Sequence, residues 1–392
     1  MLRSLYSGIS GLRSHQTMLD VTGNNIANVN TTGFKSSATQ FQDTLSQLTQ
    51  AAGTPQGEIG GTNPAQVGLG VQVAAITTNF GQGSTQTTGK GTDMLISGDG
   101  FFMVQSGGET LYTRAGAFEF DSNGRLVGPN GEMVQGWNAV NGVVQQGGQL
   151  SSIQLPYGAV NPSTQTQNAT VTGTIPAGSE PGKELVRTID VYDANGNELT
   201  LTLRLTAQAD GNWAVNASTG DPATAYTGTL AFAGNAVSGG GAFTVGGIAV
   251  DLADVTTFPN ISTISISEQD GNAAGTLDSY SISNDGSILG LFSNGEQQVL
   301  GQIAVANFIN PAGLEKAGGS TYRASVNSGA PTVGAPGTDG RGALQTGALE
   351  MSNVDLSQEF TNLIVAQRGF QANARIITTS DEVLQELSNL KR

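Results

Sequence analysis

The sequence contains no cysteine and only one histidine among its 392 residues. Without cysteine the chain has no disulfide, no thiol nucleophile and no thiolate ligand for a metal. A single histidine, His15, removes most histidine-based acid–base catalysis and most zinc sites. These shortages argue against an enzyme, and we expect no catalytic residue, no metal site and no cofactor.

Charged and aromatic residues are also scarce, at 12% and 6% of the chain. No stretch approaches the roughly 18 uninterrupted apolar residues of a membrane-spanning helix. The first residues lack the apolar core of a cleaved secretory signal, which by itself would indicate a cytoplasmic protein. The net charge of −15 falls almost entirely between residues 46 and 345, so both ends are nearly neutral. We therefore expect buried ends, a water-facing middle, and neither nucleic acid nor membrane as a partner.

The first 30 residues carry a helical pattern. Its apolar residues recur every seven positions on one row, with Leu2 and Ile9 on the adjacent row. The main row consists of Leu5, Leu12, Leu19 and Ile26. Gly33 and the Asn-rich stretch before it are expected to end this helix. We predict a further short helix over residues 38–50 and an extended Gly/Pro linker over 53–70.

The other end of the chain repeats this pattern. One heptad row consists of Leu349, Leu356, Leu363, Phe370, Ile377 and Leu384. The partner row is partly polar and consists of Phe360, Gln367, Ala374 and Asp381. The spacing predicts a helix over about residues 356–389, roughly 50 Å long. The two terminal helices either pair with each other and with neighbouring copies or cap the protein's own core, and the spacing alone does not decide between these.

The residues between the two ends predict antiparallel β-structure. Glycine is abundant, with 56 residues in the chain. Two-residue turns with the sequence Asp-Gly or Asn-Gly recur at 99–100, 123–124, 195–196, 210–211, 270–271 and 285–286. Such turns need positive φ, which Asn and Gly accept at low cost. Leu199, Leu201, Leu203 and Leu205 alternate with polar residues, as expected of a strand with one wet face.

These patterns predict an α+β fold that is mostly β, with antiparallel β domains and an α-helical coiled-coil region formed by the N- and C-terminal segments. We expect three parts. Residues 1–70 with 346–392 form a terminal helical assembly domain and linker, 71–145 with 278–345 an inner β domain, and 146–277 an outer inserted β domain. The Thr/Gly/Pro-rich stretch 163–182 is expected to be a connection.

Isolated residues that could indicate chemistry have simpler interpretations. Trp137 and Trp213 could form a carbohydrate platform, but buried Trp in a β-sandwich is commoner. The segment Asp193–Gly196 resembles part of a calcium loop, lacks its final Glu and fits a hairpin better. His15 lies beside the apolar row with no second ligand, so we expect a polar residue at the edge of the helix seam.

Two long motifs resemble the bacterial flagellar rod and hook family of axial proteins. The N-terminal motif runs over residues 24–35 as NNIANVNTTGFK. The C-terminal motif is SNVDL at 352–356 followed by QRGFQANAR at 367–375. GDGFF at 98–102, YTRAG at 112–116 and QVLGQ at 298–302 match the family's inner β domain. Rod members are shorter, so the inserted β region resembles the hook members, with a distal rod protein of the basal body as the alternative.

The resemblance implies a structural subunit that polymerises into a flexible curved tube, a universal joint that links the basal-body rod to the filament and transmits torque. Its implied partners are further copies of itself, rod and hook–filament junction proteins, and the hook cap and export apparatus during assembly. It implies an extracellular place on the flagellum, reached by export without a cleaved signal peptide. A secreted carbohydrate-binding or adhesive β protein is a less favoured alternative, because it would not explain the two ends.

The residues expected to carry assembly belong to the two motifs and their apolar rows. At the N-terminal end they are Leu5, Ile9, Leu12, Leu19, Asn24, Asn25, Ile26, Asn28, Asn30, Gly33 and Phe34. At the C-terminal end they are Asn353, Val354, Asp355, Leu356, Leu363, Gln367, Arg368, Phe370, Ile377 and Leu384. We expect both ends to be disordered in the monomer and to fold when a copy joins the tube. Contacts between copies would be heterologous, and the outer domains would slide as the tube bends.

Overall fold

A computed structural model describes residues 2–55, 57, 60–140, 142–156, 158, 160–220 and 225–390 of the chain. It contains many strands and two long helices, one at each end, which confirms the predicted fold class. The chain divides into two compact units. Unit 1 comprises residues 1–155, 281–289 and 299–392, and unit 2 comprises 156–280 and 290–298.

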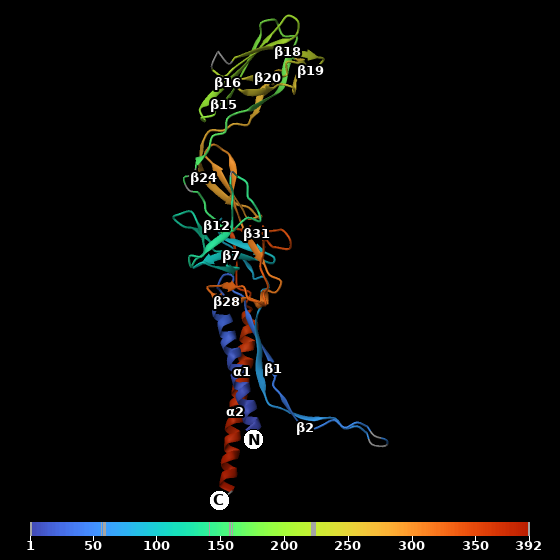
Figure 1. The fold of residues 1–392 in the computed structure, drawn as a ribbon, viewed down its shortest axis with the longest axis vertical. Coiled ribbons are helices and arrows are strands. Elements are labelled where there is room, and N and C mark those ends of the chain that lie inside the picture. Colours follow the sequence, from blue (N-terminus) through green and yellow to red (C-terminus); the bar gives the residue numbers. More distant parts are fainter. Residues whose placement is uncertain are drawn as a thin grey trace. The chain divides into compact units, whose positions relative to one another are not determined.

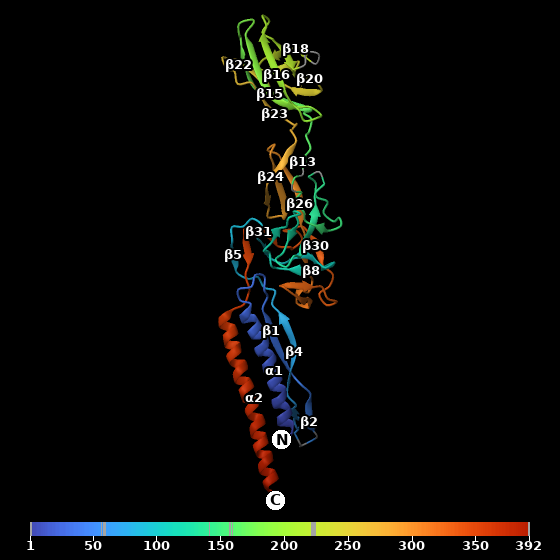
Figure 2. The same ribbon diagram turned by 90° about the vertical axis from the view of Figure 1, so that its left-hand side faces the viewer.

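The two long helices lie side by side and run in opposite directions (Figures 1 and 2). They are α1 (Leu2–Ala27) and α2 (Leu356–Leu390), close to the ranges predicted from the heptad spacing. The last turns of α2 extend past the start of α1 (Figure 2). None of the helices in the described part of the chain is long and apolar enough to cross a membrane.

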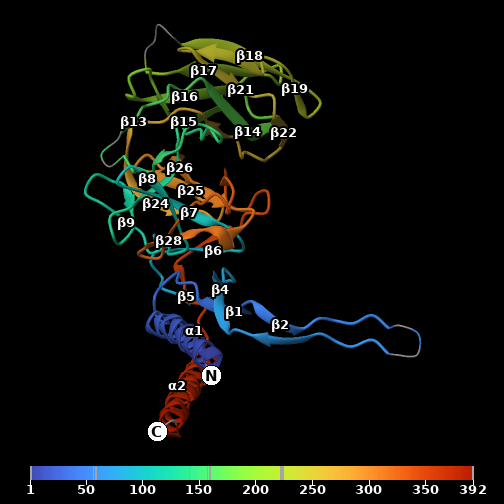
Figure 3. The same ribbon diagram turned by 60° about the horizontal axis from the view of Figure 1, so that its bottom comes forward.

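Between α1 and the first core strands the chain forms a two-stranded arm, seen in blue in Figure 3. Its strands are β1 (Ser37–Asp43), β2 (Ser46–Gln50), β3 (Ala65–Gly68) and β4 (Val71–Thr78). β1 pairs antiparallel with β4, and β2 pairs antiparallel with β3.

The predicted helix over residues 38–50 is therefore wrong. The first half of this segment pairs with β4, a strand rich in β-branched residues, and the second half pairs with β3, and this pairing decides the conformation of a segment whose own preference is weak. The predicted linker over 53–70 contains β3, so it is not a linker throughout. Positions 56, 58 and 59 of that linker lie outside the described residues.

The β domain of unit 1 is built around β7 (Phe101–Ser106), which pairs with three other strands. Its strands before the insertion are β5 (Thr85–Thr87), β6 (Met94–Ser97), β8 (Glu109–Thr113), β9 (Glu119–Phe120), β10 (Leu126–Val127), β11 (Met133–Asn138) and β12 (Ser151–Ser152). Those after it are β27 (Val305–Asn307), β28 (Glu315–Gly318), β29 (Thr321–Arg323), β30 (Thr332–Gly334), β31 (Ala343–Thr346) and β32 (Ala348–Glu350), with a short 3-10 helix at Pro311–Gly313. The two halves join in one sheet because β7 pairs with β27 and β8 with β29.

Both faces of β7 are buried, and its side chains alternate between two apolar clusters. Phe102 and Val104 pack into one cluster with Met94, Phe118 and Leu344. Phe101 and Met103 pack into the other cluster, which also contains Tyr112, Trp137, Phe308 and Tyr322. Trp137 is 5% exposed, so the prediction of core packing for this residue is confirmed.

Unit 2 contains a wrapped β-sheet with its own core. The strands of this sheet are β14 (Asn168–Ala177), β15 (Glu184–Tyr192), β16 (Glu198–Ala207), β17 (Trp213–Ser218), β18 (Tyr226–Ala233), β19 (Ala236–Gly239), β20 (Ala242–Val245), β21 (Ile248–Asp251), β22 (Val255–Pro259) and β23 (Ser265–Gln269). Unit 2 also contains β13 (Val160–Asn161), which is not part of this sheet. Three further strands have residues in both units: β24 (Gly275–Ile282), β25 (Ser287–Phe292) and β26 (Gln297–Ile303). The stretch predicted to be a connection, 163–182, instead contains the central strand β14, which pairs parallel with β21 and β22 and antiparallel with β23.

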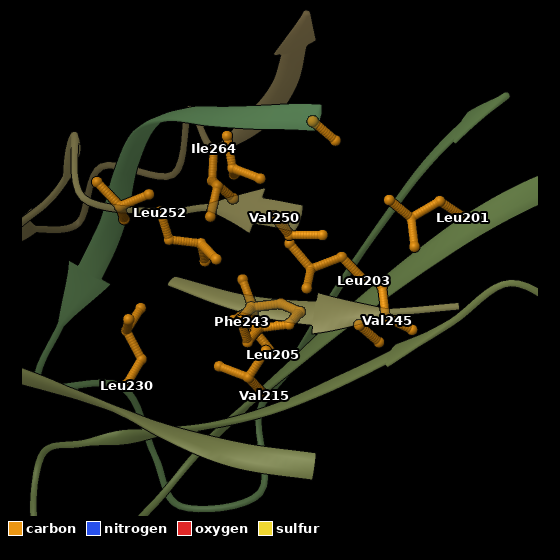
Figure 4. Packing of buried hydrophobic residues seen from close by; sticks show 14 of the residues in the cluster. Leu201, Leu203, Leu205, Val215, Leu230, Phe243, Val245, Val250, Leu252 and Ile264 are labelled. Atoms are coloured by element: carbon orange, nitrogen blue, oxygen red, sulfur yellow. The ribbon is translucent and has the colours of Figure 1, made fainter. Parts of the chain in front are cut away.

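The core of unit 2 confirms the period-two pattern of β16. Leu201, Leu203 and Leu205 are almost fully buried, and Figure 4 shows them facing Val215, Phe243 and Val250. Leu199, at the start of the same strand, is instead 39% exposed. Trp213 is 2% exposed within this core, so it also cannot serve as a carbohydrate platform.

Four of the six predicted turns close hairpins. The turns at 123–124, 195–196, 210–211 and 285–286 connect β9 to β10, β15 to β16, β16 to β17, and β24 to β25. The turns at 99–100 and 270–271 connect strands that do not pair with each other, so hairpins are wrong there. The interpretation of Asp193–Gly196 as a hairpin turn is confirmed. The three-part domain division stays a prediction, since the compact units have different boundaries.

Candidate assembly interface

The two sequence motifs meet where the helices join the β domain of unit 1. Asn25, from α1, is 1% exposed and hydrogen-bonds to both β1 and α2. Its Nδ2 donates to the carbonyl of Ser37 at 2.8 Å and to Oε1 of Glu359 at 3.0 Å, and its Oδ1 accepts from the Ser37 amide at 3.0 Å. A single amide side chain therefore ties α1, β1 and α2 together.

The C-terminal motif makes the reciprocal contacts. Asn353 accepts a hydrogen bond from the amide of Ser36 at 2.8 Å and donates to the carbonyls of Asn79 and Gly81 at 2.8 and 3.0 Å. Asp355 caps the start of α2, because its Oδ1 accepts from the amide of Ser357 at 2.8 Å. The motif thus positions α2 on the segment that leaves α1.

Gly33 allows the chain to turn against the β domain. Its φ is +67°, and its amide donates to the carbonyl of Glu350 at 2.7 Å. A Cβ at this position would collide with the backbone nitrogen of Ala115. Only glycine satisfies both the left-handed conformation and the close approach.

Beneath this junction lies a buried group of charges from three distant parts of the sequence. The side chains of Lys35 and Glu350 are fully buried, and Nζ of Lys35 lies 2.5 Å from Oε1 of Glu350. Arg114 approaches the second carboxylate oxygen at 3.5 Å and donates to the carbonyl of Gly98 at 2.9 Å. Two buried cations therefore share one buried carboxylate.

Burial also shifts the pKa values of the two cations. Burial lowers the pKa of the Lys35 ammonium, and the hydrogen bond from Lys35 to Glu350 opposes that shift. Burial likewise lowers the pKa of Arg114, against the attraction of Glu350. Because an unpaired charge in this place would be strongly unfavourable, Glu350 is the group on which the junction depends.

The helix pair is held together by small and polar side chains. The buried residues of α1 are Gly8, Gly11, Ser14, Thr22 and Asn25, and those of α2 are Glu359 and Ala366. A Cβ on Gly11 would lie 2.6 Å from Oδ1 of Asn373, and one on Gly369 would lie 2.5 Å from the ring of His15. The glycines therefore set the close approach of the two helices.

His15 on α1 and Gly369 on α2 contact each other where the two helices approach. The imidazole of His15 lies over Gly369 and is also 5.9 Å from the ring of Phe41 on β1. The predicted position of His15 at the edge of the seam is confirmed. Gly369, in the middle of α2, leaves the space that this ring occupies.

None of the predicted N-terminal apolar row is fully buried. Leu5, Leu12, Leu19 and Ile26 are half-buried, and Ile9 is 39% exposed. Of the motif residues, Asn25 and Gly33 are buried, Asn28 and Phe34 are half-buried, and Asn24 and Asn30 are exposed. Asn28 donates to the carbonyl of Asn24 at 2.9 Å, which closes the last turn of α1.

The predicted C-terminal residues are exposed to a greater degree. Four of them are half-buried: Asn353, Val354, Leu363 and Ile377. The other six are exposed: Asp355, Leu356, Gln367, Arg368, Phe370 and Leu384. Further large apolar side chains of α2 are exposed at Phe360, Ile364, Val365, Ile376 and Val383, each by 42–54%. The partner helix α1 thus leaves apolar surface of α2 largely uncovered, both on the predicted heptad rows and beside them.

The arm also presents apolar surface. Every described residue of β2 and β3 is exposed. The larger apolar side chains of the arm are Phe41, Leu45, Leu48, Val67 and Ile76, exposed by 39–83%. A two-stranded ribbon of this kind has little stability of its own and gains from packing against another surface.

The contacts at the junction are hydrogen bonds, ion pairs and close packing. No group of three or more His, Cys, Asp or Glu residues in the described part of the chain could hold a metal ion. The residues that the sequence did not single out for assembly, Lys35, Glu350, Arg114 and Glu359, position the helices. Lys35 and Arg114 stand within the quoted motifs, whereas nothing in the local sequence marks Glu350, which lies 315 positions from Lys35.

Three family models match the chain along its length. The flagella basal body rod protein model matches residues 5–35, the flagellar hook protein FlgE/F/G D1 domain model matches 95–175, and the flagellar basal body rod FlgEFG protein C-terminal model matches 345–390. The first and last ranges contain the two motifs that meet at the junction.

Full-length relatives agree with these models. The chain is 39% identical to the flagellar hook protein FlgE of Borreliella burgdorferi, with all of both chains covered. It is 36% identical to the flagellar hook protein FlgE of Salmonella typhimurium, over 99% of this chain and all of the relative. It is also 35% identical to the flagellar basal-body rod protein FlgG of Bacillus subtilis, again with all of both chains covered.

Proposed function

This chain belongs to the flagellar hook and rod protein family, and from that premise we infer that it is the structural subunit of a bacterial flagellar hook. Such a subunit functions by assembling with copies of itself and with other flagellar components. The relatives that it matches are structural proteins, and the proposal includes no enzymatic activity. The finer parts of the proposal, which concern the contacts, the bending and the torque, follow below.

The observation that carries the proposal is the exposed apolar surface of α2. The helix pair buries a stripe of small residues and leaves eight large apolar side chains of α2 exposed by 37–54%: Leu356, Phe360, Ile364, Val365, Phe370, Ile376, Val383 and Leu384. These side chains lie on more than one side of the helix, and burying what remains of each is worth on the order of 1 kcal/mol. Neighbouring copies that cover this surface would therefore gain several kcal/mol, and the assembly residues predicted at both ends would lie in those contacts.

The test replaces part of this exposed apolar surface and leaves the buried stripe of small residues unchanged. Phe360→Ser, Ile364→Ser and Val365→Ser change exposed side chains, so the monomer should fold as before. We expect the triple variant to lose polymers in electron micrographs while its far-ultraviolet circular dichroism stays unchanged. The matched control is Gln358→Ser, Thr361→Ser and Gln385→Ser, three exposed polar residues of the same helix, which should polymerise normally. Normal polymers from the apolar variant would contradict the proposal.

A place in the distal rod is the second candidate, since the relative from Bacillus subtilis is a rod protein of comparable identity. The two candidates differ in where the protein sits. Immunogold labelling of isolated hook–basal bodies should mark the curved segment outside the cell envelope if the chain forms the hook. Label confined to the straight rod would favour the alternative.

We also propose that the tube bends as a universal joint and transmits torque from the rod to the filament. Unit 2 supports this idea because its core is complete within its own strands, from Ala169 to Ile264. Its exterior need not be packed against anything for the unit to be stable. Contacts between such units in neighbouring copies can be polar and can slide as a row of subunits shortens and lengthens.

The bending proposal can be tested by removing most of unit 2 at the point where two of its segments pair. Thr164 and Asn272 exchange backbone hydrogen bonds at 2.9 and 3.1 Å, and Thr166 lies against Gly271. Replacing residues 167–270 by a short glycine linker should therefore leave the rest of the fold undisturbed. We expect tubes that are straight or stiff, and tubes that remain curved and compliant would contradict the joint mechanism.

The remaining parts of the proposal concern placement and partners. The rod, the hook–filament junction, the hook cap and the export apparatus would be its partners in the flagellum, and the assembled tube would be extracellular. Export through a narrow channel requires an unfolded chain, and the absence of cysteine leaves no disulfide to obstruct it. The protein should therefore reach culture supernatants of strains that lack the cap.

A further inference from the structure

Unit 1 contains a cavity of about 220 Å³ beside the turn that follows α1. Thr31 and Thr32, which belong to the N-terminal motif, line part of it. Gly319 and Ser320, from the hairpin between β28 and β29, line another part. Asn130 and Gly319 are exposed, so the cavity is accessible from solvent on that side.

The one charged side chain in the described lining is Glu132, which is 8% exposed. Its Oε1 accepts a hydrogen bond from Nδ2 of Asn130 at 3.0 Å. Within the described part of the chain Oε2 accepts no hydrogen bond, and no lysine or arginine forms an ion pair with this carboxylate. A carboxylate that has lost most of its water without gaining a cation is unfavourable. This cavity therefore has an unused place for a positive charge.

Two hydroxyl groups complete a set of acceptors in the same cavity. The side chains of Thr32 and Ser320 line it, and neither hydroxyl hydrogen-bonds to the part of the chain that the structure describes. A primary ammonium has three N–H donors and no acceptor. Oε2 of Glu132 and the two hydroxyl oxygens offer one acceptor for each of these donors.

The rest of the lining suits an aliphatic chain. Val104, Phe118 and Pro129 contribute apolar side chains. A cavity of about 150 Å³ already accepts benzene, so this one has room for an ammonium with a chain of a few carbons. A bare calcium ion fits less well, because it takes about six to eight oxygen ligands and prefers several carboxylates.

We propose that this cavity is a binding site for an alkylammonium group, with the ammonium on Glu132. The group belongs either to a free small amine or to a lysine side chain of another copy. Lys35, Lys90 and Lys316 already have partners within their own chain. Lys183 is exposed, and in the described part of the chain its ammonium has no partner, so it is the lysine available for this role.

The site can be tested on the monomer with n-butylammonium chloride as the probe. Saturation-transfer difference NMR at pH 7 should show saturable binding, with a Kd on the order of 1 mM for so small a ligand. Glu132→Gln keeps the shape of the side chain and the oxygen that Asn130 contacts. It should weaken binding roughly tenfold or more, because it removes the charged acceptor. The matched control is Glu315→Gln, an exposed glutamate of the same unit that does not line the cavity.

A second variant and a second probe separate binding from a change in folding. Thr32→Val replaces one hydroxyl by a methyl group and should weaken binding roughly three- to tenfold. Circular dichroism should show the same fold for every variant. n-Butanol, with sodium chloride at matched ionic strength, lacks the charge and should not compete. Absence of saturable binding, equal binding by Glu132→Gln, or equal binding of n-butanol would overturn the proposal.

A chemical cross-link distinguishes the two sources of the ammonium. A water-soluble carbodiimide joins a carboxylate to an amine in contact with it, so treated polymers should yield a peptide pair that links Glu132 with Lys183 if the lysine is the ligand. Mixed polymers of ordinary and ¹⁵N-labelled chains show whether the link joins two copies. A link between copies, lost in Glu132→Gln, assigns the site to the lysine, and this arm rests on the proposed function. Binding by the monomer with no such link assigns it to a free amine. Failure to polymerise would contradict the proposed function alone, since the monomer titration tests the site without it.

Discussion

Replacing Glu350 by glutamine should be among the most damaging conservative changes in unit 1. The substitution keeps the size of the side chain and an oxygen for the amide of Gly83, which donates to Glu350 at 2.9 Å. It removes the carboxylate that forms ion pairs with the buried ammonium of Lys35 and the buried guanidinium of Arg114. Breaking a buried pair in this way costs about 3–5 kcal/mol, because the remaining charge has lost its water and its partner.

An independent limit gives the same magnitude. Lys35 can escape the penalty by releasing its proton, and from an ordinary pKa of 10.5 this costs about 5 kcal/mol at pH 7. This value limits the part of the loss that comes from Lys35, and Arg114, whose guanidinium stays protonated at pH 7, adds its own part. For a domain of this size the expected fall in unfolding temperature is roughly 6–20 °C. Thermal unfolding of the monomer, followed by circular dichroism, measures it.

The order of two variants tests the reasoning more sharply than either magnitude. Lys35→Met leaves Glu350 beside Arg114, so the remaining buried charges still balance. The carbonyl of Gly81 loses its hydrogen bond from Lys35 in this variant, but it still accepts one from Asn353 at 3.0 Å. Glu350→Gln should therefore destabilise unit 1 more than Lys35→Met does. The control is Glu109→Gln, which changes an exposed partner of Arg323 and should have a far smaller effect. An equal or smaller loss for Glu350→Gln than for Lys35→Met would refute the account of the junction.

Three further predictions concern single substitutions. Gly33→Ala should destabilise unit 1 by more than about 1 kcal/mol, because of the positive φ and the collision with Ala115. Gly23→Ala, which has open space around it in α1, should instead stabilise the helix by about 0.8–1.0 kcal/mol, and urea unfolding compares the two variants. Gly369→Ala should weaken the helix pair, because overpacking against His15 costs about 1–3 kcal/mol and outweighs the gain in helix propensity. Adding His15→Ala should restore the pair, and helix content in thermal melts measures both effects. Hydrogen bonds from Asn197 hold the pKa of Asp193 below its ordinary value of 3.8, so this carboxylate stabilises unit 2 above that pH and the contribution is lost as the pH falls below it. Acid titration of Asp193→Asn should therefore show a flatter fall in stability.

The β-structure followed from local sequence where one face of a strand is wet. Leu201, Leu203 and Leu205 alternate with polar residues, and the structure buries all three. Asn-Gly and Asp-Gly turns marked hairpins correctly where the flanking residues alternate. They failed at 99–100 and 270–271, because a turn fixes a change of direction but not which strands pair afterwards.

The arm could not be predicted from its own residues. Residues 38–50 have no decisive preference, and their conformation is set by pairing with strands that come later in the chain, β1 with β4 and β2 with β3. Similarly, the pairing of Lys35 with Glu350 joins residues 315 positions apart, and no spacing rule connects them. Contacts of this kind depend on the completed topology.

The terminal helices show a different limit. The heptad rows predicted the existence and length of α1 and α2, but not the faces that pair. The pairing runs along small residues such as Gly8, Gly11 and Ala366, which carry no periodic apolar signal. Apolar periodicity marks surface that is stabilised by burial, and much of that surface stays exposed within one chain.

Hydrogen exchange of α1 and α2 in dilute monomer and in polymer tests the central claim most directly. The apolar faces of these helices are half-buried or exposed within one chain, so their backbone amides should exchange rapidly in the monomer. In the polymer the same amides should become strongly protected, while those of β7 and β16 change little. Full protection of both helices in the dilute monomer would contradict the account, because the two ends would then need no neighbouring copy to complete them.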